Sequence, residues 1–343
     1  MSKSPKHQNR LRASIAAAAV ALFALTGCAA GEGPAEPSAD PTSGETQQVL
    51  RVDFAYWNPL SLVIKDQGWL EAAVKDQGYT VEWIQSAGSS KAIENLNAEA
   101  IDIGSSAGAA AFAARANGVA LTTVGVFSQP NWASIVVGKD SKITKVSELK
   151  GKKIAAASGT DPYFFLLQAL AEAGLSSADV EIVNLIHADG QKALESGDVD
   201  AWAGLDPLTA TSERTAGSKI IYSNPTFNSW GVLSATDKFL AEKPELVEIV
   251  LQQYQLARQW ILDNPDQAVE ILARDAQLDP ADAAKVLLDR TNVNVSLIPG
   301  ATQLAVWTTV SKVLVAEGAI KSQEAADDAL ATIINDSIAK KIG

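Results

Sequence analysis

The stretch LKGKKIAAASGTDPYFF (residues 149–165) indicates a strand, a tight turn and the start of a helix. The β-type run of residues 153–157 breaks at the small residues 158–159. A helix is predicted behind Asp161 and Pro162, because Asp is a favoured N-cap and Pro is favoured at the first helical position. The first turn of such a helix can hold an anionic group on its free N–H groups. The stretch therefore predicts either an ordinary βα connection or a ligand site.

Strand and helix patterns alternate along the chain on both sides of this stretch, from Leu50 to Tyr222. Such alternation is typical of parallel sheets with crossover helices. Each predicted strand ends in a Gly-, Ser- or Asn-rich loop, on the side where open α/β sheets bind ligands. After Trp230 the pattern is mostly helical, with helices starting near residues 244, 265, 279, 301 and 322. A chain of 343 residues exceeds the usual size of a single core, so two lobes are expected.

The first 27 residues predict an export signal, because four basic residues and an apolar run too short to span a bilayer comfortably lie there. The sequence LTGC that ends at Cys28 resembles the lipobox of bacterial lipoproteins, which implies that Cys28 is lipidated and becomes the mature N-terminus. Cys28 is the only cysteine, so no intramolecular disulfide can form, and a reactive thiol is the alternative. Residues 28–48 are rich in Pro, Glu, Ser, Thr and Gly and predict a flexible tether.

Composition argues against several classes of function. The chain carries a net charge of −12, and loss of the basic signal makes the body more acidic still, so a nucleic-acid partner is not expected. His187 is the only histidine beyond the signal, and no cysteine follows Cys28, which argues against His- or Cys-based catalysis and multi-ligand metal sites. No enzyme activity, cofactor or metal is predicted. Later apolar runs are too short to cross a membrane, which predicts a soluble body tethered to the outer face.

Four segments carry a resemblance to a known family: QGWLE (67–71), LNAEAIDIG (96–104), ELKGKKIA (148–155) and GDVDAWAGLDP (197–207). Together with the lipobox, they resemble the substrate-binding proteins of ABC importers for aliphatic sulfonates, taurine and nitrate. The resemblance implies an α/β, type II periplasmic-binding-protein fold of two lobes. Each lobe has a mixed, mostly parallel sheet flanked by helices, and the ligand lies in the cleft between them. The implied crossings lie near Trp132 to Ser134 and Trp230 to Ser234, so that lobe I comprises residues 49–133 and 234–343 and lobe II residues 134–233.

The resemblance also implies which residues line the cleft. From lobe I these are Tyr56, Trp57, Asn58, Ser86, Gly88, Ser89, Ser105 and Ser106. From lobe II they are Ser158, Gly159, Thr160, Asp161, Tyr163, Trp202 and Asp206. Hydroxyls and backbone N–H groups can bind an oxyanion without a buried salt bridge, and Trp and Tyr suit an alkyl or aromatic remainder. The alternatives are that the tryptophans pack in the cores, that Ser89 only solubilises its loop, and that Asp206 only caps a helix.

Asp161 bears on the choice of ligand. A carboxylate in a desolvated cleft is unfavourable beside a pure anion. If Asp161 faces the ligand, a zwitterion such as an amino-sulfonate, or a neutral heterocycle, is favoured over nitrate. If Asp161 only caps its own helix, it carries no such implication.

The function implied by the resemblance is that of an extracytoplasmic, lipid-anchored binding protein at the cell membrane. It captures a small organic sulfonate, or a related anion or zwitterion, by lobe closure and delivers it, as a monomer, to an ABC permease and its cytoplasmic ATPase. The alternatives are binding of nitrate or a thiamine-pyrimidine precursor, and a sensor lipoprotein without a transporter. A pyrimidine-synthase-like enzyme is disfavoured by the lipobox and the missing Cys motif. Replacing Thr160 or Trp57 by Ala is expected to weaken binding.

Overall fold

The computed structural model describes residues 48–343. The predicted export signal, Cys28 and residues 28–47 of the predicted tether lie outside the described residues. Gln48, the last residue of the predicted tether, is the first residue of strand β1.

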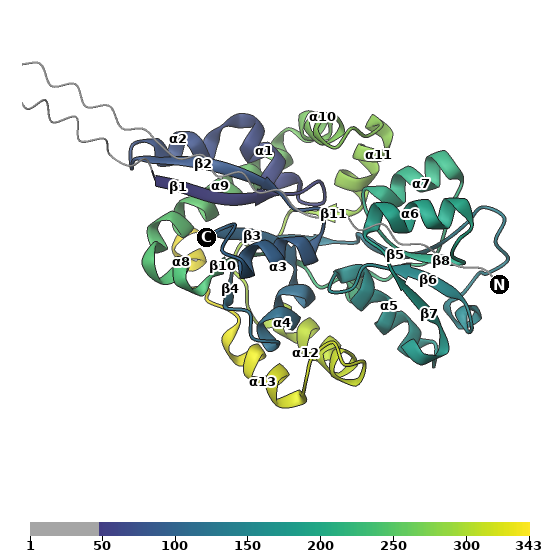
Figure 1. Ribbon diagram of the computed structural model, residues 1–343. Helices are drawn as coiled ribbons and strands as arrows, with labels where there is room; N and C mark the ends of the chain where they lie inside the picture. Colours follow the sequence, from purple (N-terminus) through teal and green to yellow (C-terminus); the bar gives the residue numbers. More distant parts are fainter. Residues whose placement is uncertain (1–47) are drawn as a thin grey trace, which may run out of the picture. The chain divides into compact units, whose positions relative to one another are not determined.

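The first sheet has six strands in the order β11-β4-β10-β3-β1-β2 (Figure 1). The strands are β1 (Gln48–Phe54), β2 (Tyr79–Gln85), β3 (Ile103–Ala107), β4 (Leu121–Pro130), β10 (Gly231–Thr236) and β11 (Thr291–Asn292). Strand β1 is parallel to β2 and β3, whereas β10 is antiparallel to β3 and β4. The sheet is therefore mixed, as predicted. We call this sheet and its helices the first lobe.

The second sheet has five strands in the order β7-β6-β8-β5-β9. The strands are β5 (Ala133–Val137), β6 (Lys153–Ala156), β7 (Glu181–Asn184), β8 (Ala201–Leu205) and β9 (Lys219–Tyr222). Strand β6 is parallel to β7 and β8, and β5 is antiparallel to β8 and β9. We call this sheet and its helices the second lobe.

Helices connect the parallel strands and fill the C-terminal third, as the alternation predicts. Those of the first lobe before the crossing are α1 (Pro59–Gln67), α2 (Trp69–Lys75), α3 (Ser89–Asn97) and α4 (Gly108–Ala116). Those of the second lobe are α5 (Asp161–Glu172), α6 (His187–Ser196) and α7 (Leu208–Ala216), with 3-10 turns η1 (Val146–Leu149), η2 (Ser177–Asp179) and η3 (Pro225–Phe227).

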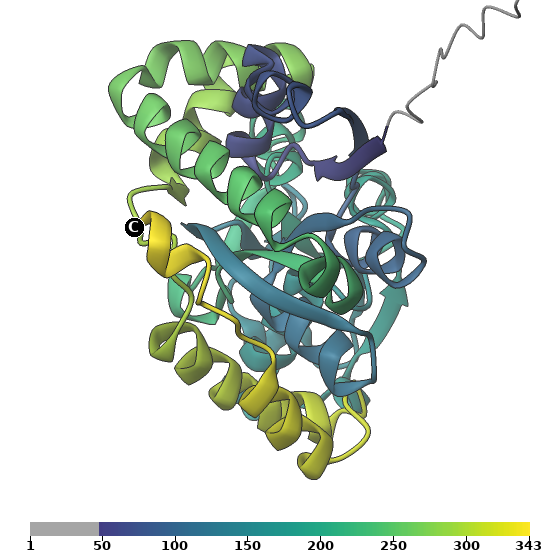
Figure 2. The same cartoon turned by 90° about the vertical axis from the view of Figure 1, so that its left-hand side faces the viewer.

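The C-terminal part begins with α8 (Asp237–Glu242), α9 (Pro244–Asp263), α10 (Pro265–Asp275), α11 (Pro280–Ala284) and the π-helix η4 (Lys285–Asp289). It ends with α12 (Ala301–Ala316), α13 (Gln323–Thr332) and α14 (Ala339–Ile342). Figure 2 shows α9 running diagonally over the first sheet, where it packs against α1 and α2. Among residues 48–343 no helix combines the length and apolar character that a membrane crossing needs.

The chain passes between the two sheets at residues 131–132, between β4 and β5, and again at residues 223–230, between β9 and β10. Ala133, which the sequence assigned to lobe I, begins β5 in the second sheet, and residues 231–233, assigned to lobe II, belong to β10 in the first sheet. At the first crossing, Trp132 packs edge-to-face on Trp57 with ring centroids 5.4 Å apart, and both contact Phe127. Aromatic packing therefore fills the space beside the crossing.

The stretch 149–165 forms a strand, a turn and a helix, as predicted. The N-cap residue of α5 is Thr160, so the expectation that Asp161 occupies this position is wrong. Asp161 is the first helical residue and is 1% exposed. Its carboxylate accepts hydrogen bonds from residues of the two crossing segments, described below, and these bonds turn it away from its own helix end.

Candidate ligand-binding site

A cavity of about 320 Å³ lies where loops of the two lobes meet, and we call it the Trp57 pocket. The first lobe contributes Tyr56, Trp57, Gln85, Ser86 and Ala87. The second lobe contributes Ile186, His187, Ala188 and the run Leu205, Asp206, Pro207 and Leu208. Ala276 and Leu278, which follow α10, close the remaining side. The wall is mostly apolar, with a few polar groups among aromatic and aliphatic side chains, which is the usual composition of a small-molecule site.

Strand ends position these loops. Residues 56–57 follow β1, Gln85 ends β2, and residues 86–87 follow it. Residues 186–188 follow β7, Leu205 ends β8, and residues 206–208 lead into α7. Because parallel strands expose their carboxyl ends on one edge of a sheet, the loops of each lobe meet at the ligand-binding edge of an open α/β sheet.

Trp57 lines this pocket and carries a buried hydrogen-bond donor. Its side chain is 6% exposed and is held by the edge-to-face contact with Trp132. The indole Nε1 has no hydrogen-bond partner among the described residues. A buried donor without a partner costs about 1–3 kcal/mol, so a ligand oxygen that accepts from Nε1 would recover this energy.

His187 supplies a second polar group, from the first position of α6. It is 2% exposed, and within residues 48–343 neither ring nitrogen has a partner. Burial lowers the pKa of His187 to about 4, so the ring is neutral at pH 7. A neutral imidazole offers one N–H donor and one acceptor nitrogen. The positive dipole end of α6 lies at the same place, and Asp189 in the first turn partly offsets its charge.

Gly88 permits the close approach of the two lobes at His187. A Cβ built on Gly88 would lie 2.8 Å from Nε2 of His187, which is too close for real atoms. The loop after β2 can therefore reach His187 only because residue 88 has no side chain. Gly88 thus lies beside the pocket, and its lack of a side chain allows the two walls to lie close together.

Asp206 lines the pocket, and its carboxylate is paired with an arginine side chain. It is 3% exposed, and its Oδ1 and Oδ2 accept hydrogen bonds from Arg290 at 3.0 and 3.1 Å. The backbone N–H of Ala210 also donates to Oδ1, at 3.1 Å. Burial raises the pKa of Asp206 to about 6, and the charge of Arg290 opposes this rise. At pH 7 the group is therefore an ion-paired carboxylate.

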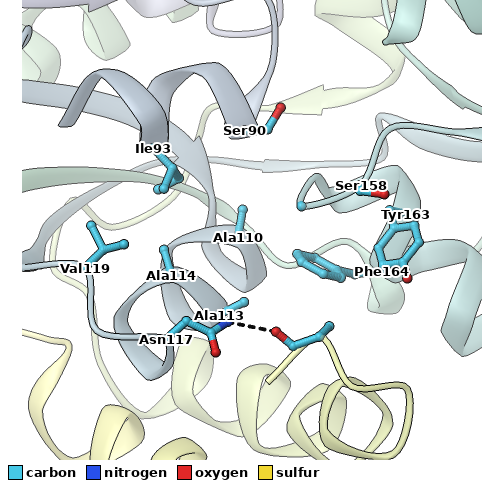
Figure 3. Close-up of a pocket in the computed structure, with 12 residues that line it drawn as sticks. Ser90, Ile93, Ala110, Ala113, Ala114, Asn117, Val119, Ser158, Tyr163 and Phe164 are labelled. Carbon is cyan, nitrogen blue, oxygen red and sulfur yellow. Dashed lines mark hydrogen bonds between the residues drawn. The ribbon is translucent and has the colours of Figure 1, made fainter. Parts of the chain in front are cut away.

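The residues that the family resemblance predicted for the cleft lie in several different places in the structure. Tyr56, Trp57, Ser86 and Asp206 line the Trp57 pocket, and Gly88 stands beside it. Ser158, Gly159 and Tyr163 line a separate cavity of about 350 Å³ between α3, α4 and the start of α5. Figure 3 shows Ala110, Ala113 and Ala114 on one side of this second cavity, with Ser158, Tyr163 and Phe164 across from them.

Three more of these residues form hydrogen bonds within the first lobe. The side chain of Asn58 caps α1 and donates to the Tyr254 hydroxyl at 3.0 Å. The Ser89 hydroxyl accepts from the Ala107 N–H at 2.9 Å. Ser105 donates from its backbone N–H and its hydroxyl to Asp53, which is 2% exposed. Burial raises the pKa of Asp53 to about 7, while the hydrogen bonds from the backbone N–H and the hydroxyl of Ser105 oppose the rise.

Three others lie in buried positions outside both cavities. The Thr160 hydroxyl donates to the Ala157 carbonyl at 2.6 Å and closes the turn before α5. Trp202 is fully buried in the core of the second lobe, where Gly190 leaves room for its indole. Ser106 lies fully buried on β3.

Asp161 joins the two crossing segments. Its Oδ2 accepts from the Trp132 indole N–H at 2.7 Å and from the Ser229 backbone N–H at 3.1 Å, and its Oδ1 accepts from the Ser229 hydroxyl. Burial raises the pKa of Asp161, and these donors oppose the rise. The carboxylate therefore ties residue 132 of one crossing to residue 229 of the other.

The sequence reasoning missed His187 and Arg290. His187 follows β7, whose carboxyl end points to the same edge as those of β6 and β8, so the strand-end rule could have found it. Arg290 lies after η4, far along the chain, and no local pattern signals its pairing with Asp206.

Known proteins resemble this chain in sequence and fold. The family model described as NMT1/THI5 like matches residues 62–268, more than half of the chain. A protein of Bacillus subtilis (strain 168) named as a binding protein for aliphatic sulfonates is 28% identical over 278 residues, 80% of this chain and 81% of its own length. A protein of Escherichia coli (strain K12) named in the same way is 30% identical over 244 residues, 71% of this chain and 76% of its own length.

Among solved structures, the alkanesulfonate-binding protein SsuA from Xanthomonas axonopodis pv. citri, bound to MOPS, matches with a TM-score of 0.74 and 23% identity. The match covers 82% of this chain and 97% of that protein. The likeness confirms the predicted periplasmic-binding fold with two mixed sheets flanked by helices.

Proposed function

Because the chain belongs to the NMT1/THI5-like family, we propose that it is an extracytoplasmic solute-binding protein that captures a small organic sulfonate in the Trp57 pocket. It then delivers the ligand to an ABC permease and its cytoplasmic ATPase, while a lipid on Cys28 anchors it to the membrane. The names of the relatives from Bacillus subtilis and Escherichia coli support a sulfonate as the ligand.

The observation that carries the proposal is the pair of buried, unpartnered polar groups in one pocket, Trp57 Nε1 and the His187 ring. A sulfonate offers three oxygen acceptors and no donor, so it suits N–H groups that lack a partner. Neutral donors and the dipole of α6 can hold the anion without the desolvation cost of a buried ion pair. Apolar neighbours such as Leu205 and Leu278 suit an alkyl body.

Size argues against nitrate as the ligand, because a cavity of about 320 Å³ has room for an organic body that nitrate lacks. A thiamine-pyrimidine precursor is the second candidate. It is favoured by the acceptor nitrogen of neutral His187, which could take an N–H from an aminopyrimidine.

Among the described residues that line the pocket, no nucleophile is hydrogen-bonded to a base. Ser86 and His187 line the same cavity, but among the described residues neither nitrogen of His187 has a hydrogen-bond partner. Nucleophilic catalysis requires that pair within hydrogen-bond reach. We therefore propose that the protein binds its ligand without transforming it.

The test is isothermal titration calorimetry with butane-1-sulfonate, nitrate and a 4-amino-pyrimidine, on the wild-type chain and on Trp57→Phe. Loss of the indole N–H should weaken sulfonate binding about 10- to 100-fold, since a hydrogen bond to a charged group is worth about 1.5–3 kcal/mol. The matched control is Trp202→Phe, which removes an unpartnered indole N–H outside the pocket and should leave affinity unchanged. Absence of sulfonate binding at millimolar concentration would refute the sulfonate assignment.

A further inference from the structure

Arg290 connects the C-terminal segment of the chain to the ligand pocket. It lies between η4 and β11, and its backbone carbonyl accepts from the Asn131 N–H at 2.7 Å at the first crossing. Its side chain is 13% exposed and reaches α7 and the residues just before it, in the second lobe. There the guanidinium donates to both carboxylate oxygens of Asp206 and, at 2.7 Å, to Glu213.

Neighbouring ion pairs hold Arg290 in this position. Lys285 on η4 pairs with the same Glu213 oxygen at 2.9 Å. Arg214, the next residue along α7, pairs with Asp282 on α11 at 2.9 Å. The guanidinium is thus fixed between two carboxylates, in the fork geometry that Arg offers and Lys does not.

The pairing controls the charge of the pocket. Asp206 is the only carboxylate among the described residues that line it, and no Lys or Arg of residues 48–343 lines it. With Arg290 in place, the wall presents a neutralised ion pair. Without Arg290, the buried Asp206 carboxyl loses its cationic partner, and a ligand ammonium group could take that place and hold the carboxyl ionised, whereas a methyl group could not.

We propose that Arg290 is a specificity-determining residue, which selects sulfonates without an amine by neutralising Asp206. The ligand class is then unsubstituted alkanesulfonates in preference to aminoalkanesulfonates. The inference rests on the proposed function. Arg290 does not line the pocket, so it acts on the choice between ligands through its pairing with Asp206.

The test compares two ligands of equal length, butane-1-sulfonate and 3-aminopropane-1-sulfonate, which differ by a terminal methyl in place of an ammonium group. Calorimetry on the full chain gives the ratio of their dissociation constants. The wild-type chain should prefer butane-1-sulfonate. Arg290→Met, which keeps the length of the side chain and removes its charge, should move the ratio toward the amine by about tenfold or more.

Two further variants separate charge from structural damage. Adding Asp206→Asn to Arg290→Met should restore the wild-type preference, because the unpaired carboxylate is then absent. Arg214→Met, the same substitution in a neighbouring ion pair that does not touch Asp206, should leave the ratio unchanged. If Arg290→Met does not fold, Asp206→Asn alone should move the ratio further away from the amine.

The outcomes distinguish the two proposals. A wild-type chain that binds neither sulfonate refutes the proposed function and this inference with it. A wild-type chain that binds butane-1-sulfonate, with a ratio that changes less than twofold in Arg290→Met or in the substitute Asp206→Asn, refutes the inference alone. Equal affinity of the wild-type chain for both ligands also refutes it.

Discussion

Replacing Asp161 by Ala is expected to destabilise the protein by about 3 kcal/mol. The substitution removes the acceptor of three hydrogen bonds, from the Trp132 indole, the Ser229 N–H and the Ser229 hydroxyl. The hydroxyl can rotate to another partner, but the two N–H donors remain buried, and each costs about 1–3 kcal/mol. The two unpartnered donors together cost roughly 2–6 kcal/mol. Removing the buried carboxylate also removes its unfavourable desolvation, so the expected net cost lies in the lower half of this range.

Asp161→Asn is the matched control for this prediction. Its amide oxygen can take the place of Oδ2 and accept from both N–H donors, while its NH₂ group donates to the Ser229 hydroxyl. The expected cost is therefore about 1 kcal/mol or less. The free energy of unfolding is measured by urea titration followed by tryptophan fluorescence, and ligand affinity by calorimetry.

Two results would refute the role of Asp161 as a tie between the crossings. One is an unfolding free energy of Asp161→Ala within about 0.5 kcal/mol of wild type, the range of an ordinary surface substitution. The other is a large loss of ligand affinity in Asp161→Asn with stability preserved. That result would mean that the carboxylate meets the ligand.

Three further predictions follow from single contacts. Gly88→Ala places a Cβ 2.8 Å from His187 Nε2 and should weaken ligand binding at least about tenfold in calorimetry; unchanged affinity would mean that this approach is not needed for binding. Thr160→Ala removes the hydroxyl bond to Ala157 and should cost about 1 kcal/mol in urea unfolding without changing affinity, in contrast to the expectation from the sequence. Asp53, whose pKa rises to about 7 in the fold, binds more protons there than in the unfolded chain between pH 4 and 7. Stability should therefore fall as pH rises through this window, by at most about 1.4 kcal/mol per pH unit, and melting curves of Asp53→Asn should show a weaker pH dependence than wild type.

The sequence by itself determined which elements form and where the loops at the strand ends emerge. The strand–turn–helix order at 149–165, the alternation along both lobes and the helical C-terminal third follow from local periodicity, turn residues and prolines. The family resemblance is confirmed by the match over residues 62–268. The family resemblance implied Tyr56, Trp57, Ser86 and Asp206 as cleft residues, and the structure brings these four to the wall of one cavity.

Only the tertiary structure decided which side chains face the pocket and which partners they have. Thr160 and Asp161 occupy a loop of the predicted kind, yet one closes its own turn and the other bonds to the crossings. Arg290 meets Asp206 across 84 positions of chain. The direction of a side chain at a strand end, and its partner from another lobe, depend on how the lobes pack together. Local patterns contain no record of that packing, because it arises from contacts between segments far apart in the chain.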